Sequence, residues 1–209
     1  MFSYSGQRID ATSGSPTLQD VAVGLGRIAR FAGQSQKFYP VILHSLLVGD
    51  LVPLQYELFG LLHDAMEAVT GDCVSTFKTK EMCELEDKMW LRFMWERFGI
   101  ENLPEGWAGH VKQADQRALF VEARRIGAPG LAEALRFNPA LTVPDSVAEQ
   151  RFDYYQNRYL LVDMVEPVGM AVRDFKERVE SAWRQYKSGI WPFTWCPFYR
   201  SWGRRGECG

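Results

Sequence analysis

The sequence contains little histidine, and its four cysteines form no C-x-x-C pair. Widely spaced cysteines in a chain of 209 residues with no signal-like start are typical of reduced thiols in a cytoplasmic protein. No apolar run approaches the ~18 residues of a membrane-spanning helix. The first residues also lack the apolar stretch of a signal peptide. We therefore expect a cytoplasmic protein that makes no membrane contact.

An excess of charge of one sign is missing as well. Lys and Arg number 24 against 26 Asp and Glu, which gives a formal net charge of −2. Such a balance supplies no broad positive field that would gather a nucleic-acid backbone. A small anionic substrate remains compatible with it, because such a substrate needs only a local cluster of basic side chains. We expect no polynucleotide partner.

Strand signals are scarce, whereas apolar residues recur at helical spacing along most of the chain. Thr17 and Asp20 resemble a capping box that opens a first helix ending at Gly33, and Pro40 and Pro53 bound a second helix. Further helices are expected at about 56–69, 79–98, 107–126, 146–164 and 168–187. The sequence predicts an all-α protein.

Two segments interrupt this helical pattern. The chain is polar and irregular from about 128 to 144, and Glu166-Pro167 separates the last two predicted helices. Residues 191–209 are rich in aromatics and contain two prolines, which is typical of an irregular extension. We expect one compact domain over residues 1–190, followed by an irregular C-terminal extension over 191–209 that packs on the domain or forms a subunit contact.

Two of the three histidines fall into one pattern with aspartates: His44, the adjacent pair His63-Asp64, and Asp115. Mixed imidazole and carboxylate donors suit a divalent first-row metal and leave coordination positions free for water and substrate. A helical bundle can aim side chains from three helices at one internal point. The pattern predicts metal-assisted hydrolysis at phosphorus. His110 is off the helix face of Asp115, and we expect it to be structural.

Glu67 follows His63 by four residues, so the two are expected on one face of the third helix. It is a candidate to hold or deprotonate a water molecule, or to protonate a leaving oxygen. Asp64, Glu67 and Asp72 crowd acidic groups into an apolar segment, and burying them without a cation is costly. Taken singly, each residue also fits a core histidine or a chance His-Asp pair.

Four strings of the sequence narrow this prediction. They are Arg30-Phe31-x-Gly33, Phe38-Tyr39-x-Val41-x-x-His44-Ser45, His63-Asp64-x-x-Glu67-x-x-x-Gly71-Asp72 and Asp115-x-Arg117-x-Leu119-x-x-Glu122. Together they resemble the metal-dependent HD phosphohydrolase superfamily, and within it the small YfbR-type 5′-deoxynucleotidases and the phage dATP triphosphohydrolases. The resemblance covers about residues 3–126, with a weaker likeness around 171–183. It implies a compact HD-domain helical bundle.

The resemblance implies a role for each matching residue. His44, His63, Asp64 and Asp115 would bind one divalent transition metal, with Zn, Mn, Co and Fe left open. Glu67 would be the catalytic acid or base. Asp72 would complete the catalytic group and contact the sugar hydroxyl.

Substrate contacts are also implied. Arg30 would reach a phosphate and Phe31 would stack on or wall the base, at a place where relatives carry Arg-Trp. Lys112, one helical turn before Asp115, is the best further candidate for a phosphate, whereas Lys78 and Lys80 are expected on a solvated surface. Glu122 lies two turns past Asp115 and can orient its neighbours. Mg²⁺ can accompany the substrate phosphates.

The function expected from these residues is removal of 5′-phosphates from deoxynucleotides, with dATP first and dADP or dAMP as further substrates. One alternative is an HD phosphodiesterase or nuclease, although a dinuclear site needs extra ligands and His110 is the one histidine left over. Another is a non-catalytic HD interaction module. We further expect a homo-oligomer, compatible with a phage-encoded protein that acts in the host cytoplasm.

Overall fold

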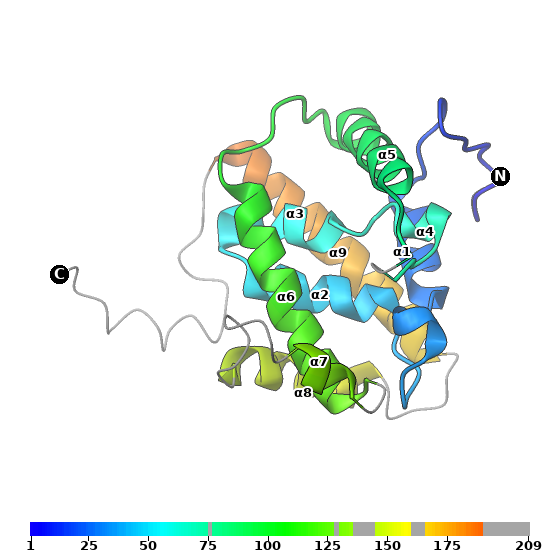
Figure 1. The fold of residues 1–209 in the computed structure, drawn as a ribbon. Helices are drawn as coiled ribbons and strands as arrows, with labels where there is room; N and C mark the ends of the chain where they lie inside the picture. Colours follow the sequence, from blue (N-terminus) through cyan, green and yellow to red (C-terminus); the bar gives the residue numbers. More distant parts are fainter. Residues whose placement is uncertain (75–76, 128–129, 136–144, 160–165, 190–209) are drawn as a thin grey trace.

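The computed structural model describes the chain except for residues 75–76, 128–129, 136–144, 160–165 and 190–209. Within the described residues the protein is a helical bundle without a strand (Figure 1), and its sheet-like pairing is confined to the isolated bridges Phe2–Arg8 and Ala29–Pro40. The all-α prediction is confirmed. The predicted extension over 191–209 lies outside the described residues, and the single domain over 1–190 stays a prediction.

The helical elements follow one another with short connections, and two of them, η1 and η2, are 3₁₀ helices. In chain order they are α1 (Leu18–Arg27), η1 (Arg30–Gly33), α2 (Val41–Leu51), η2 (Leu54–Tyr56), α3 (Glu57–Leu62), α4 (Glu67–Thr70), α5 (Lys80–Phe98), α6 (Trp107–Arg125), α7 (Leu131–Leu135), α8 (Ser146–Tyr159) and α9 (Glu166–Ser188). None of these described helices combines the length and the apolar character needed to cross a membrane.

Helix α2 forms the centre of the bundle. It packs against α1, α3, α6, α8 and α9, and Figure 1 shows α6 crossing over it. All side chains from Val41 to Gly49 are buried, so α2 has no solvated face. A helix that is apolar on every side is expected in such a central position. His44, which is fully buried, therefore stands as a polar side chain inside the core.

The predicted start of α1 is confirmed, but its predicted end is wrong. The Thr17 hydroxyl accepts a hydrogen bond from the Asp20 backbone, and the Asp20 carboxylate accepts one from the Thr17 backbone. The helix ends at Arg27 rather than at Gly33. The reason is that Ile28 pairs with Val41 through a 3.0 Å backbone hydrogen bond, which turns the chain into an extended conformation.

The following 3₁₀ turn, η1, contains an unusual backbone. Phe31 and Ala32 have φ values of 58° and 50°, in the left-handed region, and Gly33 follows with φ 74°. Residues other than glycine rarely adopt this region, which costs on the order of 1 kcal/mol or more at each position. Such strain is concentrated at functional sites in many proteins. Here it occurs directly after Arg30.

The predicted third helix is broken, and this is the largest difference from the expected fold. Helix α3 ends at Leu62, residues 63–66 form turns, and α4 begins at Glu67. The ring of His63 donates from Nδ1 to the Gly60 carbonyl (2.8 Å), and the indole of Trp90 donates to the Leu62 carbonyl (2.7 Å). In a continuous helix, these two carbonyls would accept hydrogen bonds from the backbone N–H groups four residues later. Here they accept hydrogen bonds from side chains.

The remaining helices agree with the sequence in part. Helices α5 and α6 match the predicted ranges closely, with Thr79 capping α5 and Gly99 ending it in the left-handed conformation (φ 65°). The segment expected to be irregular contains the short helix α7. Glu166-Pro167 begins α9 instead of separating two helices, because proline is tolerated in the first turn of a helix.

Candidate metal centre

The four predicted ligands come from three parts of the fold and meet at one place. His44 lies on α2, His63 and Asp64 lie in the turn between α3 and α4, and Asp115 lies on α6. The Nε2 atoms of the two histidines are 3.3 Å apart, and His44 Nε2 is also 3.3 Å from Asp115 Oδ1. The placement of His63 and Asp64 in the middle of a helix was wrong, but their convergence with His44 does not depend on it.

His44, His63 and Asp115 form a group that can hold a metal ion, because their donor atoms all lie within 4.8 Å of one another. Two ligands that each bind one ion at about 2.1 Å stand about 3 to 3.4 Å apart at tetrahedral or octahedral angles. The observed separations fall in this range. Nitrogen and carboxylate donors are also the types that a divalent transition metal prefers. The residues present therefore fit a metal ion.

Asp64 stands beside this group. Its Oδ2 atom is 3.1 Å from His63 Nε2, 3.6 Å from His44 Nε2 and 3.9 Å from an Nη atom of Arg30. Burial acts to raise the pKa of Asp64, but His63, His44 and Arg30 together outweigh it and hold the pKa well below its usual range. The carboxylate is thus ionised and available to a cation.

The charges around His44 favour a positive ring when no metal is bound. Burial and the charge of Arg30 act to lower its pKa, whereas Glu122 and Asp115 outweigh them and raise the pKa to about 9. For Asp115, burial is opposed by the hydrogen bond with His44, and the pKa lies far below its usual range. A proton on His44 Nε2 would occupy the position of a metal, so metal binding must release it.

Glu67, the first residue of α4, differs from the other acidic groups because it favours the protonated form. Burial and the negative charges of Asp64 and Asp72 raise its pKa to about 9. Its Oε2 atom is buried and has no hydrogen-bond partner among the described residues. In the metal-free protein Glu67 therefore favours the protonated form at neutral pH. The expected single helix face shared with His63 is absent, since residues 63–66 form turns.

Asp72 lies in the loop after α4, with a buried Oδ2 atom that has no hydrogen-bond partner within the described part of the chain. Burial raises the pKa of this carboxyl, with Arg30 acting in the opposite direction and Asp64 adding to the rise. These effects put Asp72 in the same electrostatic environment as Arg30 and Asp64. The oxygen is free to accept a hydrogen bond from a bound molecule.

Arg30 is buried and faces two carboxylates. Its Nε atom donates a 2.8 Å hydrogen bond to Glu122 Oε2, and its guanidinium carbon lies 5.5 Å from the centre of the Phe31 ring. The sequence predicted Arg30 as a phosphate ligand without anticipating the Glu122 contact. The Nε edge of the guanidinium is thus bound by Glu122, and one Nη atom lies 3.9 Å from Asp64.

Two lysines lie beside acidic residues of the site. Lys112 is mostly exposed, and its Nζ atom lies 3.2 Å from Asp115 Oδ2, in agreement with its predicted place beside the site. Lys78 was expected on a solvated surface, which is wrong: its Nζ atom is 3.8 Å from Glu67 and 2.5 Å from Glu86. Lys78 follows a loop, and no periodicity in the sequence could have indicated where that loop would lead.

The third histidine takes no part in the site. His110 is exposed and stacks on Tyr56, with the ring centres 4.9 Å apart. Its predicted structural role is consistent with this contact. Lys80, whose side chain is 85% exposed, is solvated as expected.

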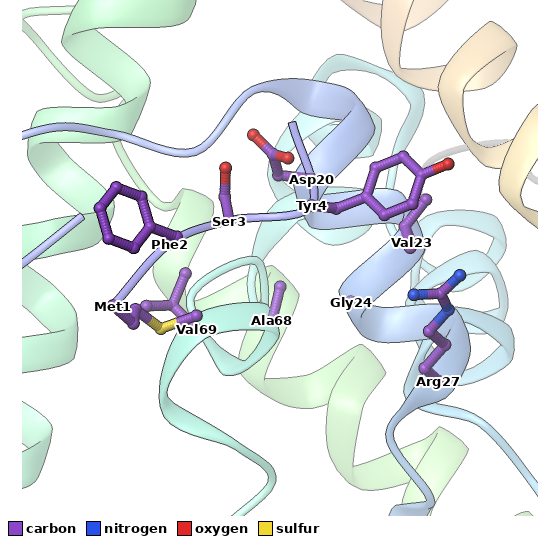
Figure 2. A pocket seen from close by; sticks show the side chains of 10 residues that line it. All are labelled: Met1, Phe2, Ser3, Tyr4, Asp20, Val23, Gly24, Arg27, Ala68 and Val69. Atoms are coloured by element: carbon purple, nitrogen blue, oxygen red, sulfur yellow. The ribbon is translucent and has the colours of Figure 1, made fainter. Parts of the chain in front are cut away.

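A small cavity of about 240 Å³ lies on another surface of α4 (Figure 2). Residues 1–4, α1 and α4 form its walls, with Arg27 at one end and Val69 at the other. None of the four candidate ligands lines this cavity. It is therefore separate from the candidate metal centre, although Ala68 in its wall follows Glu67 directly.

The fold and the site define an all-α protein with a candidate metal centre of histidine and aspartate. No family model matches the chain. It is 36% identical over 115 residues to "Uncharacterized protein YfdR" of Escherichia coli K12, covering 53% of this chain and 61% of that protein. It is 34% identical over 148 residues to "Uncharacterized protein RCAP_rcc00048" of Rhodobacter capsulatus, covering 63% of this chain and 75% of that protein.

The second of these relationships shows the family. The match extends over three quarters of the Rhodobacter protein, and the chain belongs to the same family as that protein. It spans about three fifths of the length of the Escherichia coli relative.

Proposed function

We propose that this protein is a metal-dependent phosphohydrolase that removes 5′-phosphates from deoxynucleotides in the cytoplasm, with dATP as the first candidate substrate. The observation that carries the proposal is the meeting of His44 and His63, Nε2 to Nε2 at 3.3 Å, between two ionised aspartates. A protonated carboxyl, Glu67, accompanies them. Cation ligands and a proton donor are the two components that phosphate ester hydrolysis requires.

His44, His63, Asp64 and Asp115 would hold the ion. A divalent ion bound by such ligands supplies Lewis acidity, which withdraws electron density from a phosphoryl oxygen and acidifies a water molecule. Three or four protein ligands leave positions for water and substrate. The buried surroundings of His44 strengthen every electrostatic interaction at the site.

Glu67 would move the proton. Water attacks phosphorus, the bond between phosphorus and the 5′-oxygen breaks, and this oxygen takes the proton that Glu67 holds. The attacking water loses its proton to the Glu67 carboxylate, which restores the acid. Lys78 Nζ, at 3.8 Å from Glu67 Oε1, stabilises the carboxylate while it is ionised.

Arg30, Lys112, Phe31 and Asp72 would bind the nucleotide. Arg30 lies next to the ligand Asp64, and Lys112 next to the ligand Asp115, so both cations can reach phosphate oxygens at the ion. The buried, unpartnered oxygen of Asp72 can accept a hydrogen bond from the sugar hydroxyl. Phe31 supplies an aromatic wall for the base at the position where the resembling enzymes carry tryptophan.

The proposal is tested by incubating the purified protein with each dNTP and dNMP in Mn²⁺, Co²⁺, Mg²⁺ or Zn²⁺, and by measuring deoxynucleoside, phosphate, pyrophosphate and triphosphate. We expect release of deoxynucleoside, with Glu67→Gln lowering kcat by about 10²- to 10⁴-fold while metal is retained. His110→Ala is the matched control and keeps full activity, because His110 is exposed and its ring stacks on Tyr56. Absence of turnover with every metal, or full activity in Glu67→Gln, would overturn the proposal.

A further inference from the structure

Glu122 of α6 has both carboxylate oxygens engaged by side chains of the candidate metal centre. Its Oε1 atom is 2.9 Å from His44 Nδ1, and its Oε2 atom accepts a 2.8 Å hydrogen bond from Arg30 Nε. Glu122 and His44 are both completely buried. Water therefore does not compete for these contacts, and the geometry of the carboxylate is held from two sides.

In the neutral ring that a metal requires, the contact determines which nitrogen of His44 keeps its proton. An ionised carboxylate can only accept a hydrogen bond, so Nδ1 of His44 must be the donor. The other oxygen of the same carboxylate accepts a hydrogen bond from the Arg30 guanidinium at 2.8 Å, and a positive charge this close favours the ionised form of a buried carboxyl. With Nδ1 as the donor, the lone pair of Nε2 becomes available on the side where His63 and Asp115 lie.

His63 has a similar arrangement with a different acceptor. Its Nδ1 atom donates to the Gly60 carbonyl at 2.8 Å, and its Nε2 atom faces that of His44. Histidines that bind metals generally donate their other ring N–H to a carboxylate or a carbonyl, and loss of such a partner typically costs 10- to 100-fold in metal affinity. Both rings of this site follow that pattern.

We infer that Glu122 is a positioning residue that fixes the ring of His44 and keeps its Nε2 atom available to a divalent cation, with Arg30 holding Glu122 in place. The inference rests on the proposed metal site. It gives Arg30 a role that does not require substrate: its charge offsets the cost of burying the Glu122 carboxylate. Arg30 thereby connects the strained turn η1 to the ligand on α2.

Glu122→Gln tests this inference through metal affinity, measured by competition of Zn²⁺ and Co²⁺ between the protein and a chromophoric chelator. The glutamine amide has one acceptor oxygen, whereas the Glu122 carboxylate accepts at both oxygens. If the amide oxygen faces His44, the amide NH₂ faces the Arg30 N–H; if the amide is flipped, its NH₂ faces the N–H of His44. In both orientations a donor faces a donor. We expect a 10- to 100-fold loss of affinity. The matched control is Asp50→Asn, since Asp50 is a half-buried carboxylate on the same helix as His44 and bonds to Tyr155 (2.6 Å) and Arg178 (2.9 Å). It should lower stability and keep the affinity.

A spectroscopic measurement separates positioning from general loosening. With three histidines in the chain, the imidazole ¹⁵N–¹H signals of the Zn²⁺-loaded, ¹⁵N-labelled protein can be assigned by substitution. The Nδ1–H signal of His44 should lie downfield, as expected for a hydrogen bond to a carboxylate. It should move upfield in Glu122→Gln and stay in place in Asp50→Asn. If Glu122→Gln does not fold, Glu122→Asp takes its place, because its shorter side chain withdraws the carboxylate from His44.

The outcomes divide clearly. Reduced affinity and a shifted His44 signal in the Glu122 variant, with Asp50→Asn unchanged in both, support the inference. Equal losses in the two variants, or an unchanged affinity in the Glu122 variant, overturn it while the proposed function stands. A native protein that binds no divalent metal overturns both.

Discussion

Gly24 of α1 and Ala68 of α4 lie so close together that a Cβ atom on Gly24 would stand 2.7 Å from the Ala68 Cβ and 2.9 Å from the Ala68 carbonyl oxygen. Backbone and Cβ atoms cannot rotate away, so a larger residue forces one helix to move. Ala68 directly follows Glu67, and both Gly24 and Ala68 line the cavity in Figure 2. The contact therefore helps to determine where the proposed proton donor stands.

The substitution Gly24→Ala should lower the free energy of unfolding by about 1 to 3 kcal/mol through overpacking, and it should lower kcat because α4 is displaced. Chemical denaturation and the phosphate-release assay measure the two effects. Gly169→Ala on α9 is the control: nothing lies within 4 Å of its added Cβ, so it should gain about 0.5 to 1 kcal/mol. Unchanged stability in Gly24→Ala would contradict the close packing.

Ala32→Gly should stabilise the protein. Ala32 is exposed and adopts φ 50°, a conformation that glycine reaches without steric cost. We expect a gain of up to about 1 kcal/mol in the free energy of unfolding. The control Ala29→Gly, at φ −78°, should lose about 0.4 to 1 kcal/mol because it only adds freedom to the unfolded chain. A loss of stability in both variants would argue against strain in η1.

Asp20 gives a prediction for the pH dependence of stability. Burial acts to raise its pKa, but hydrogen bonds from Thr17 and Ser5 lower it to about 2, from an ordinary value of 3.8. The folded protein thus favours the ionised form. The resulting stabilisation is fully present above about pH 4 and is lost as the pH falls through about 2.

The measurement is the difference in the free energy of unfolding between the native protein and Asp20→Asn, followed from pH 6 to pH 2. Taking this difference cancels the contributions of the other carboxyl groups. Allowing for screening by nearby solvent, it should be roughly 1 kcal/mol larger at pH 6 than at pH 2. A difference that stays constant over this range would show that Asp20 titrates alike in the folded and unfolded chains.

Metal binding should raise the melting temperature, because an ion that binds the folded state alone stabilises it by mass action. At a metal concentration of 100 times Kd the gain is about 2.7 kcal/mol, which corresponds to several degrees for a chain of this size. Thermal unfolding with and without Zn²⁺ or Co²⁺ measures the shift. His63→Ala should remove most of it and His110→Ala should keep it. Equal shifts in the two variants would place the metal elsewhere.

Local signals made part of the fold predictable from sequence. The capping box of Thr17 and Asp20 is complete within a few residues, and the structure contains it. The break after Leu62 was not predictable in this way. It depends on Trp90, whose indole reaches the Leu62 carbonyl from 28 residues further along the chain. Apolar periodicity continues through this break and therefore favoured one helix.

The candidate site shows the same division. Residue type and spacing predicted that His44, His63 and Asp115 would converge, and they do. The position of Lys78 beside Glu67 depends on the path of a loop, which carries no periodic signal. The second contact of Glu122 depends on Arg30, 92 residues earlier in the sequence. Contacts between residues so far apart in the sequence are set by the tertiary fold, and no local sequence pattern predicts them.

The 92-residue separation of Arg30 and Glu122 also bears on the order of folding. Closing so long a loop carries an entropic cost that must be met before the contact can form, which places non-local contacts of this kind late in folding. During synthesis, α1 and α2 emerge well before α6, and His44 then has neither Asp115 nor Glu122 beside it. A nascent chain that ends before Trp107 consequently lacks one of the two candidate aspartate ligands, and the candidate metal centre is complete only when α6 docks.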